Sequence, residues 1–213
     1  TPTGATDSSS ASHANGYLYS YTHYPNNIDW ILGVSVDSLE ESTFKPRKQI
    51  NPKAGMVWRL NNETTLRTAL SRSLKRPLIT NQTIEPTQVA GFNQFYDDFT
   101  LTDTWLYGFG IDKKWGSWLF GGLEFIERDL HLLPKNQDWN ERSYRAYLNW
   151  NFTSKLTATL AFHLEEFDGA INDSIVPEST TTYDSKAGLR FFDPSGFFCN
   201  IEAEYVNQRT KWP

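Results

Sequence analysis

Apolar and polar residues alternate along most of this chain, from about residue 16 to residue 208. Between Leu156 and Glu166 the apolar residues fall on even positions and mostly polar residues fall on odd positions. Successive side chains of a β-strand point to opposite faces, so this stretch predicts a strand with one apolar and one polar face. The same split recurs in 29–37, 51–60, 103–112 and 142–152. The pattern predicts an all-β, antiparallel protein.

Ten strands in five hairpins are expected. They lie at about 16–24, 28–39, 49–60, 64–73, 101–112, 117–129, 141–152, 156–167, 181–192 and 197–208. Within each pair the turn is short and rich in turn-forming residues. Between pairs the connections are longer and polar, at about 40–48, 74–100, 130–140 and 168–180. Residues 1–14, rich in Ser, Thr and Ala, are predicted to be a loop or disordered, and the barrel domain or fragment is predicted to fill 15–213.

Short turns at one end of the strands and long connections at the other are typical of outer-membrane barrels. Strands of about 9–12 residues suit a tilted membrane strand and exceed the ~5–6 residues usual in soluble sheets. Trp and Tyr at the tips of the apolar faces suit the aromatic girdles of such barrels. We therefore expect an antiparallel up-and-down transmembrane β-barrel in the bacterial outer membrane, in contact with its lipid bilayer. A half-buried soluble sheet also alternates and is the alternative fold.

Composition narrows the choice further. The 213 residues carry a net charge of −5, which gives no reason to expect nucleic-acid binding. The only cysteine is Cys199, so no disulfide can form within the chain. No apolar run approaches the roughly 20 residues of a membrane helix, so a membrane role would have to come through strands.

The sequence lacks the patterns that carry enzyme chemistry. Its four histidines show no metal-ligand spacing such as His-Glu-x-x-His, and no Gly-x-Ser-x-Gly elbow is present. Glu165 and Glu166 are neighbours on one strand, so they face opposite ways and cannot act as a catalytic pair. We expect no enzyme activity, no metal and no cofactor.

Two groups of residues are candidates for contact with a solute. The polar faces of the strands carry charges that suit a wet lumen, and the residues predicted to face it are Lys53, Arg59, Arg67, Arg145, His163, Glu165, Glu202 and Glu204. The connection 74–100 is long enough to be functional. It combines cations with aromatic rings that could grip a ligand, namely Lys75, Arg76, Phe92, Phe95 and Tyr96. The alternative is a loop folded on its own aromatics and packed into the barrel mouth.

The sharpest motif is the segment from Asn51 to Pro77, NPKAGMVWRLNNETTLRTALSRSLKRP. It resembles a hairpin of TonB-dependent receptor barrels, with Asn-Pro opening a strand, a periplasmic polar turn, Thr-Thr-Leu-Arg, and an Arg-Pro that leads into an extracellular loop. A looser match follows at 84–86 and 104–112, where Gly108 replaces the Glu usual in that family. The stretch 74–94 is also similar to bacterial proteins in which tetratricopeptide repeats precede a receptor-like barrel without a plug.

Two departures from the receptor pattern matter. Residues 1–14 contain nothing like the plug domain with its TonB-contacting box, and the chain ends in Arg-Thr-Lys-Trp-Pro rather than in a Phe-closed strand. Receptor barrels have about 22 strands. We therefore expect this chain to be a fragment of a larger barrel, completed in the full-length protein by a plug or a periplasmic repeat domain.

The resemblance implies a receptor-like barrel that binds or passes a solute through its loops and lumen. A plugless exporter fed by periplasmic tetratricopeptide repeats is the second possibility. A structural or adhesive barrel that binds a partner is the third. Conductance separates these functions, because an exporter or pore opens a channel and a filled adhesin does not.

Overall fold

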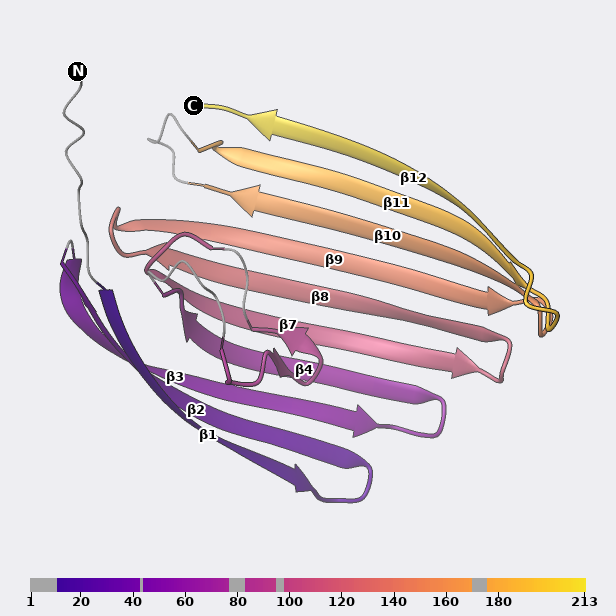
Figure 1. The fold of residues 1–213 in the computed structure, drawn as a ribbon, viewed down its shortest axis with the longest axis horizontal. Helices are drawn as coiled ribbons and strands as arrows, with labels where there is room; N and C mark the ends of the chain where they lie inside the picture. The colour runs from indigo at the N-terminus through magenta and orange to yellow at the C-terminus, as the bar shows by residue number, and fades with distance from the viewer. Residues whose placement is uncertain (1–10, 43, 77–82, 95–97, 170–175) are drawn as a thin grey trace.

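The chain folds into one antiparallel sheet of ten strands, each paired with its neighbour in sequence (Figure 1). The computed structural model describes residues 11–42, 44–76, 83–94, 98–169 and 176–213. In sheet order the strands are β1 (Ala11–His23), β2 (Ile28–Glu41), β3 (Phe44–Arg59), β4 (Thr64–Leu74), β7 (Thr102–Trp115), β8 (Leu119–Leu132), β9 (Gln137–Asn151), β10 (Leu156–Asp168), β11 (Ser179–Phe192) and β12 (Phe198–Lys211). A separate two-stranded hairpin joins β5 (Gln88–Val89) to β6 (Phe92–Asn93).

The predicted up-and-down order of ten strands is confirmed, but the strands are longer than the sequence indicates. β1 begins at Ala11, so residues 11–14, predicted to be a loop, pair with 38–41 of β2. Most of the predicted connections 40–48 and 130–140 is likewise strand. Ladder hydrogen bonds join backbone groups, so pairing continues where the alternation of apolar and polar side chains changes or ends. Residues 1–10 lie outside the described part of the chain.

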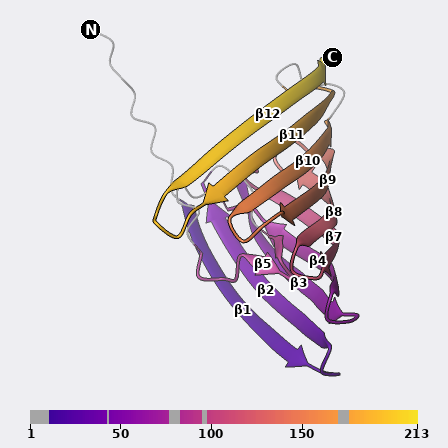
Figure 2. The ribbon, with the colours of Figure 1, turned by 90° about the vertical axis from the view of Figure 1, so that its right-hand side faces the viewer.

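The sheet is strongly curved and open. Figure 2 shows both edges swinging to the side of the sheet that carries β5. Within the part of the chain that the structure describes, β1 and β12 each pair with one neighbour only. The described residues therefore form an open, curved sheet and not the closed barrel that the sequence predicts. We call the side toward which the edges swing the concave face, and the opposite side the convex face.

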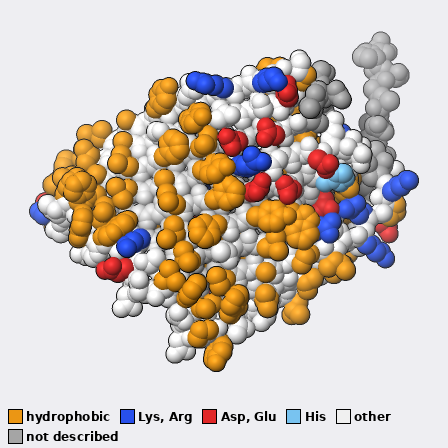
Figure 3. All heavy atoms as spheres, turned by 180° about the vertical axis from the view of Figure 1, so that it is seen from behind, with side chains coloured by type: hydrophobic (Ala, Val, Ile, Leu, Met, Phe, Trp, Pro, Cys, Tyr) orange, Lys and Arg blue, Asp and Glu red, His pale blue; other side chains and the backbone are white. Residues whose placement is uncertain are grey.

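The convex face is largely apolar and exposed (Figure 3). Side chains on this face alternate with those on the concave face along each strand. Leu160 on β10 is 55% exposed and Ile201 on β12 is 65% exposed, and both belong to the convex face. Soluble monomers rarely leave such an extended apolar area in water.

Aromatic rings and charges bound this apolar area. Trp118, Trp150 and Phe152 lie in ring contact near the tight turns, with centroids 6.3 and 4.3 Å apart. Toward the longer connections, Phe125 and Tyr144 pack at 5.0 Å. Beyond them the convex face turns polar, as Figure 3 shows in its charged patch. That polar zone contains ion pairs such as Arg72–Asp103, Arg47–Asp103 and Arg142–Glu127.

None of the described residues belongs to a helix of the length and apolarity that crossing a bilayer requires.

Candidate functional site

The connection between β4 and β7 folds onto the concave face. Its hairpin, β5 and β6, lies in front of the sheet in Figure 1 and inside the curve of the sheet in Figure 2. The turn residues Ala90 and Gly91 both have positive φ, 49° and 88°. Two-residue hairpin turns of the I′ type require this conformation at both positions, so the turn is tight although one position is not glycine.

Glycines in the sheet make room for the hairpin. A Cβ at Gly55 would lie 2.6 Å from Cγ1 of Val89, and a Cβ at Gly108 would lie 2.6 Å from the Phe92 ring. Val89 and Phe92 are fully buried as a result, in a cluster with Ala69 of β4. Glycine therefore lets the hairpin backbone approach the sheet more closely than any side chain would allow.

Arg67 of β4 supports the hairpin from below. Its guanidinium lies 5.1 Å from the centre of the Phe92 ring, within cation–π range. It also donates hydrogen bonds to Asp112 at 2.8 Å and to Glu124 at 3.2 Å. The two carboxylates hold the guanidinium plane, so the predicted lumen residue Arg67 contacts the folded loop.

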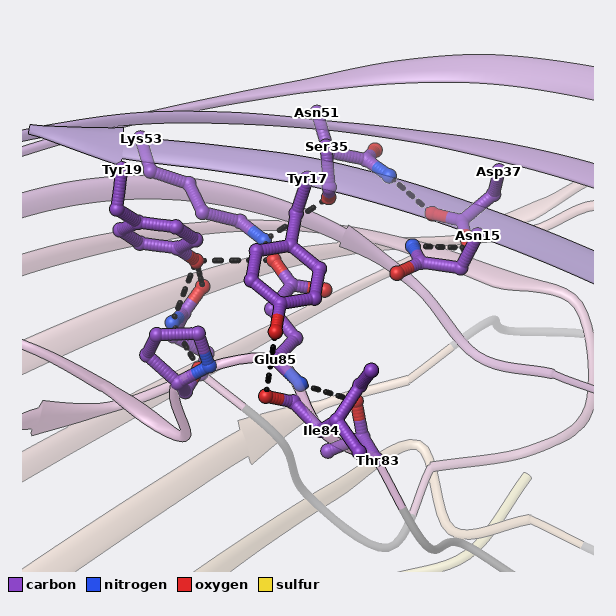
Figure 4. A network of polar contacts seen from close by, with 12 residues as sticks. Asn15, Tyr17, Tyr19, Ser35, Asp37, Asn51, Lys53, Thr83, Ile84 and Glu85 are labelled. Carbon is purple, nitrogen blue, oxygen red and sulfur yellow. Dashed lines mark hydrogen bonds and ion pairs between the residues drawn. The ribbon is translucent and has the colours of Figure 1, made fainter.

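A buried ion pair fastens the start of the loop to the sheet (Figure 4). The Lys53 amine of β3 pairs with Glu85, and the two side chains are 1% and 3% exposed. Lys53 also donates to the Ser35 hydroxyl at 3.1 Å, and Tyr19 donates to Glu85 at 2.9 Å. Strands β1 and β3 thus contact one carboxylate that comes from the loop, and β2 contacts the Lys53 amine that pairs with it. Removing one partner of a buried pair typically costs about 3–5 kcal/mol, because the other charge is left without compensation.

Further hydrogen bonds extend this attachment. The Tyr17 hydroxyl donates to the carbonyl of Ile84 at 3.0 Å, as Figure 4 shows. The side chain of Gln94 donates to the Pro86 carbonyl at 2.6 Å and to the Tyr19 hydroxyl at 3.1 Å. Segment 84–94 is therefore held on both of its arms.

A second polar anchor lies at the other end of the loop. Arg128 of β8 donates to both carboxylate oxygens of Asp98, at 2.7 and 2.6 Å, and also pairs with Glu141 of β9. Arg128 is buried. The loop is thus attached to the sheet through β1–β3 at one end and through β8 and β9 at the other.

A cavity of about 630 Å³ lies on the concave face beside this second anchor. Its apolar part includes Leu130, Trp139 and Phe167, and its polar part includes Arg145 and Glu165. Its volume is within the range of about 300–1,000 Å³ that small-molecule sites occupy.

All eight side chains predicted to face a lumen lie on the concave face by strand register. They are Lys53, Arg59, Arg67, Arg145, His163, Glu165, Glu202 and Glu204. Their environments differ. Lys53 and Arg67 lie under the loop, whereas Arg145, Glu165, Glu202 and Glu204 are mostly exposed. Arg59 and His163 are intermediate, with side chains 47% and 21% exposed.

The loop residues predicted to contact a ligand are not brought together. Phe92 is buried between Gly108 and Arg67, so its ring packs the loop against the sheet. Lys75 and Arg76 are half-buried at the base of the loop. Phe95 and Tyr96 lie outside the described residues. The alternative expectation was a loop folded on its own aromatics and packed into the barrel mouth. The buried position of Phe92 against the sheet agrees with this alternative.

Several residues of this site carried no signal in the sequence. Tyr19, Ser35 and Gln94 look like ordinary surface positions of strands and loops. Glu85 is separated from Lys53 by 32 positions, and Gln94 from Tyr19 by 75. Alternation places Lys53 on the polar face but cannot indicate which loop residue meets it.

The described residues contain no group of three or more His, Cys, Asp or Glu side chains that could hold a metal ion. No protein-family model matches the chain, and no curated protein matches it. The resemblance to TonB-dependent receptor barrels and the expectation of no enzyme activity therefore stay predictions.

Proposed function

We propose that this chain forms part of the wall of an outer-membrane transport barrel, with the convex face against lipid and the concave face lining a lumen that residues 83–94 narrow. The observation that carries the proposal is the opposite character of the two faces. The convex face of the sheet exposes apolar side chains. The concave face carries charged side chains and the buried polar contacts that attach the loop.

The dimensions of the apolar area fit a bilayer. On β10 the convex side chains from Leu156 to Leu164 are apolar at every alternate position. Eight steps of about 3.3 Å give about 26 Å along the strand. A strand tilt of about 40° reduces this to about 20 Å, and the flanking aromatic residues extend it toward the ~25 Å outward band of known barrels.

The arrangement of the connections supports the same function. All five hairpin turns lie at one end of the sheet, and the two long connections, 75–101 with its folded loop and 169–178, lie at the other. The remaining two connections at that end, 42–43 and 133–136, are short because β2, β3, β8 and β9 extend into them. Outer-membrane barrels place short turns in the periplasm and long loops outside the cell. A loop that folds inward from the outer end narrows the lumen without closing the wall, so passage of a small solute fits the geometry better than a purely adhesive role.

Closure of the wall is required by the same physics. A bilayer offers no water to the backbone N–H and C=O groups of an edge strand, so β1 and β12 must find partners in the membrane. The proposal thus includes pairing of both edges in the full-length protein, either with each other or with further strands.

Membrane extraction and conductance test the proposal directly. The full-length protein is expected to fractionate with outer membranes and to resist extraction by carbonate. It should migrate faster on unheated than on boiled SDS gels, and open ion channels in planar bilayers. Recovery of the folded protein in the soluble fraction would overturn the membrane assignment, and a membrane-inserted protein without conductance would favour the adhesive role.

A further inference from the structure

We infer that solute moves along the concave wall formed by β9–β12, because the folded loop blocks the way along the other half of the concave face, and that the preferred solute is neutral and hydrophilic. This inference rests on the proposed transport function. It adds the location of the path and the chemical class of what passes.

Matched positions on the two halves differ in solvent access. β3 is third from one edge of the sheet and β10 is third from the other. Lys53 on β3 has a side chain 1% exposed, whereas His163 and Glu165 on β10 have side chains 21% and 58% exposed, and all three lie on the concave face. Edge effects are the same for both strands, so the difference comes from the loop that covers β3 and not β10.

Beneath the hairpin, the covered half has no room for a solute. Besides Lys53, the concave side chains of Ser35, Asn51 and Ser71 are buried there. The hairpin contacts the sheet at Gly55 and Gly108, where even a methyl group would collide. A hollow of about 640 Å³ between Arg59 and Asp112 lies farther along, at the end with the tight turns. Water and solute therefore cannot pass between the hairpin and the sheet as long as the loop stays attached.

The open half presents a continuous series of charged side chains. Across β11 and β12, Lys186 pairs with Glu204 at 2.9 Å and Arg190 pairs with Glu202 at 2.8 Å. The series ends at the cavity of about 630 Å³, which Arg145 and Glu165 line together with the apolar side chains of Leu130, Trp139 and Phe167. That cavity lies at the end with the longer connections, where an incoming solute would enter.

The charges along this path nearly compensate one another. Lys186 lies between Asp184 and Glu204, Arg190 pairs with Glu202, and Arg145 lies 3.7 Å from Glu124. The carboxylates Glu165, Asp184, Glu202 and Glu204 outnumber the cations Arg145, Lys186 and Arg190 by one, so the wall carries only a small negative excess and attracts neither sign strongly. Such a surface still offers hydrogen-bond donors and acceptors throughout. A neutral solute with many hydroxyl or amide groups can bind and leave these groups without breaking an ion pair.

Cysteine accessibility locates the path. In a Cys199→Ser background, the full-length protein carries Glu165→Cys or Glu204→Cys on the open half, or Ser71→Cys as the matched control under the loop. A sulfonated methanethiosulfonate reagent is added to single channels in planar bilayers. We expect a stepwise loss of conductance for the first two variants and no reaction for Ser71→Cys.

Reversal potentials and solute uptake test the chemical class. In a KCl gradient the unaltered channel should show a reversal potential near zero, and vesicles containing it should swell in L-arabinose. Lys186→Glu removes the cation that Asp184 and Glu204 share and should shift the reversal potential toward cation selectivity, whereas Lys186→Arg should leave it unchanged. Strong ion selectivity of the unaltered channel, or exclusion of arabinose, would overturn the assignment of a neutral solute.

The outcomes separate this inference from the proposed function. Absence of channels in a folded, membrane-inserted protein defeats the transport function itself. Channels that react at Ser71→Cys as fast as at Glu165→Cys leave transport intact and overturn the location of the path.

Discussion

Replacing Leu160 by arginine is the sharpest test of whether the convex face contacts lipid or water. Leu160 lies at the centre of the apolar series on β10, four residues from both Leu156 and Leu164. That distance is about 13 Å in each direction at ~3.3 Å per residue. In the proposed barrel this position is near the middle of the bilayer.

The two possible solvents predict different magnitudes. On the lipid face of a barrel, arginine near the midplane costs about 2–4 kcal/mol. On the exposed surface of a soluble sheet the same change stays within about 0.5 kcal/mol, since Leu160 is already 55% exposed. With an m-value of about 2 kcal/mol per M urea, a loss of about 2 kcal/mol moves the unfolding midpoint by about 1 M.

Urea titration of the full-length protein in phospholipid vesicles measures this shift. Thr159→Arg is the matched control, because Thr159 is the adjacent residue on the concave face and faces Asn149 and Gly188, which carry no charge. We expect a lower midpoint for Leu160→Arg and little change for Thr159→Arg.

Equal midpoints for both variants would refute the reasoning, because they would show that the convex face does not meet hydrocarbon. A larger loss for Thr159→Arg would reverse the assignment of the two faces.

Three further predictions concern the loop and one turn. Gly108→Leu should expel the hairpin, lower the free energy of unfolding by about 1–3 kcal/mol through overpacking, and make residues 83–94 sensitive to protease. Lys53→Met should cost about 3–5 kcal/mol by leaving Glu85 buried and uncompensated, and adding Glu85→Gln should recover part of that loss in a double-mutant cycle. The amine of Lys155 holds the pKa of Asp193 below its ordinary range. The resulting stabilisation of this turn is present above the ordinary aspartate pKa and is lost as pH falls through the lowered value, so Lys155→Met should raise the Asp193 pKa measured by NMR.

Controls for these variants come from the same chain. Gly16→Leu on β1 should be tolerated, because a Cβ at Gly16 has no atom within 4 Å. Glu202→Gln breaks an exposed ion pair on the same face as Lys53 and should not change stability measurably. A Gly108→Leu variant with an intact, protease-resistant loop would contradict the close packing of Phe92. An unchanged Asp193 pKa in Lys155→Met would contradict the role given to the amine.

The strands could be predicted because their signal is local. In a sheet with one apolar face, apolar residues recur at every second position of each strand. All ten strands and their order could therefore be predicted from this alternation. The strand ends could not be placed the same way. Near Glu40 the residues on both faces are polar, and near His131 the apolar residues Leu130 and Leu132 lie on the concave face instead of the convex face, while backbone pairing continues in both places.

The loop attachment could not be predicted because its signal is non-local. β5 and β6 have two residues each, too few to show a period. Gly55 and Gly108 matter only because Val89 and Phe92 arrive from elsewhere in the chain. A polar side chain such as Lys53 shows its face in the sequence, but its burial depends on a partner in the loop.

The directions of the two edge strands limit how the wall can be completed. β1 runs from the end with the longer connections toward the tight turns, and β12 runs the opposite way. β12 could therefore pair with β1 directly in antiparallel fashion. An even number of further strands inserted between β12 and β1 would also close the barrel with antiparallel pairs only. An odd number would force one parallel pair, which a two-residue turn cannot connect. In the proposed barrel the total strand number is thus even, and the folded loop occupies a smaller share of the lumen as that number grows. The conductance lost on reaction at Glu165→Cys therefore measures the size of the completed barrel as well as the position of the path: a near-complete block indicates a narrow barrel closed by these strands alone, and a small fractional loss indicates a wider one.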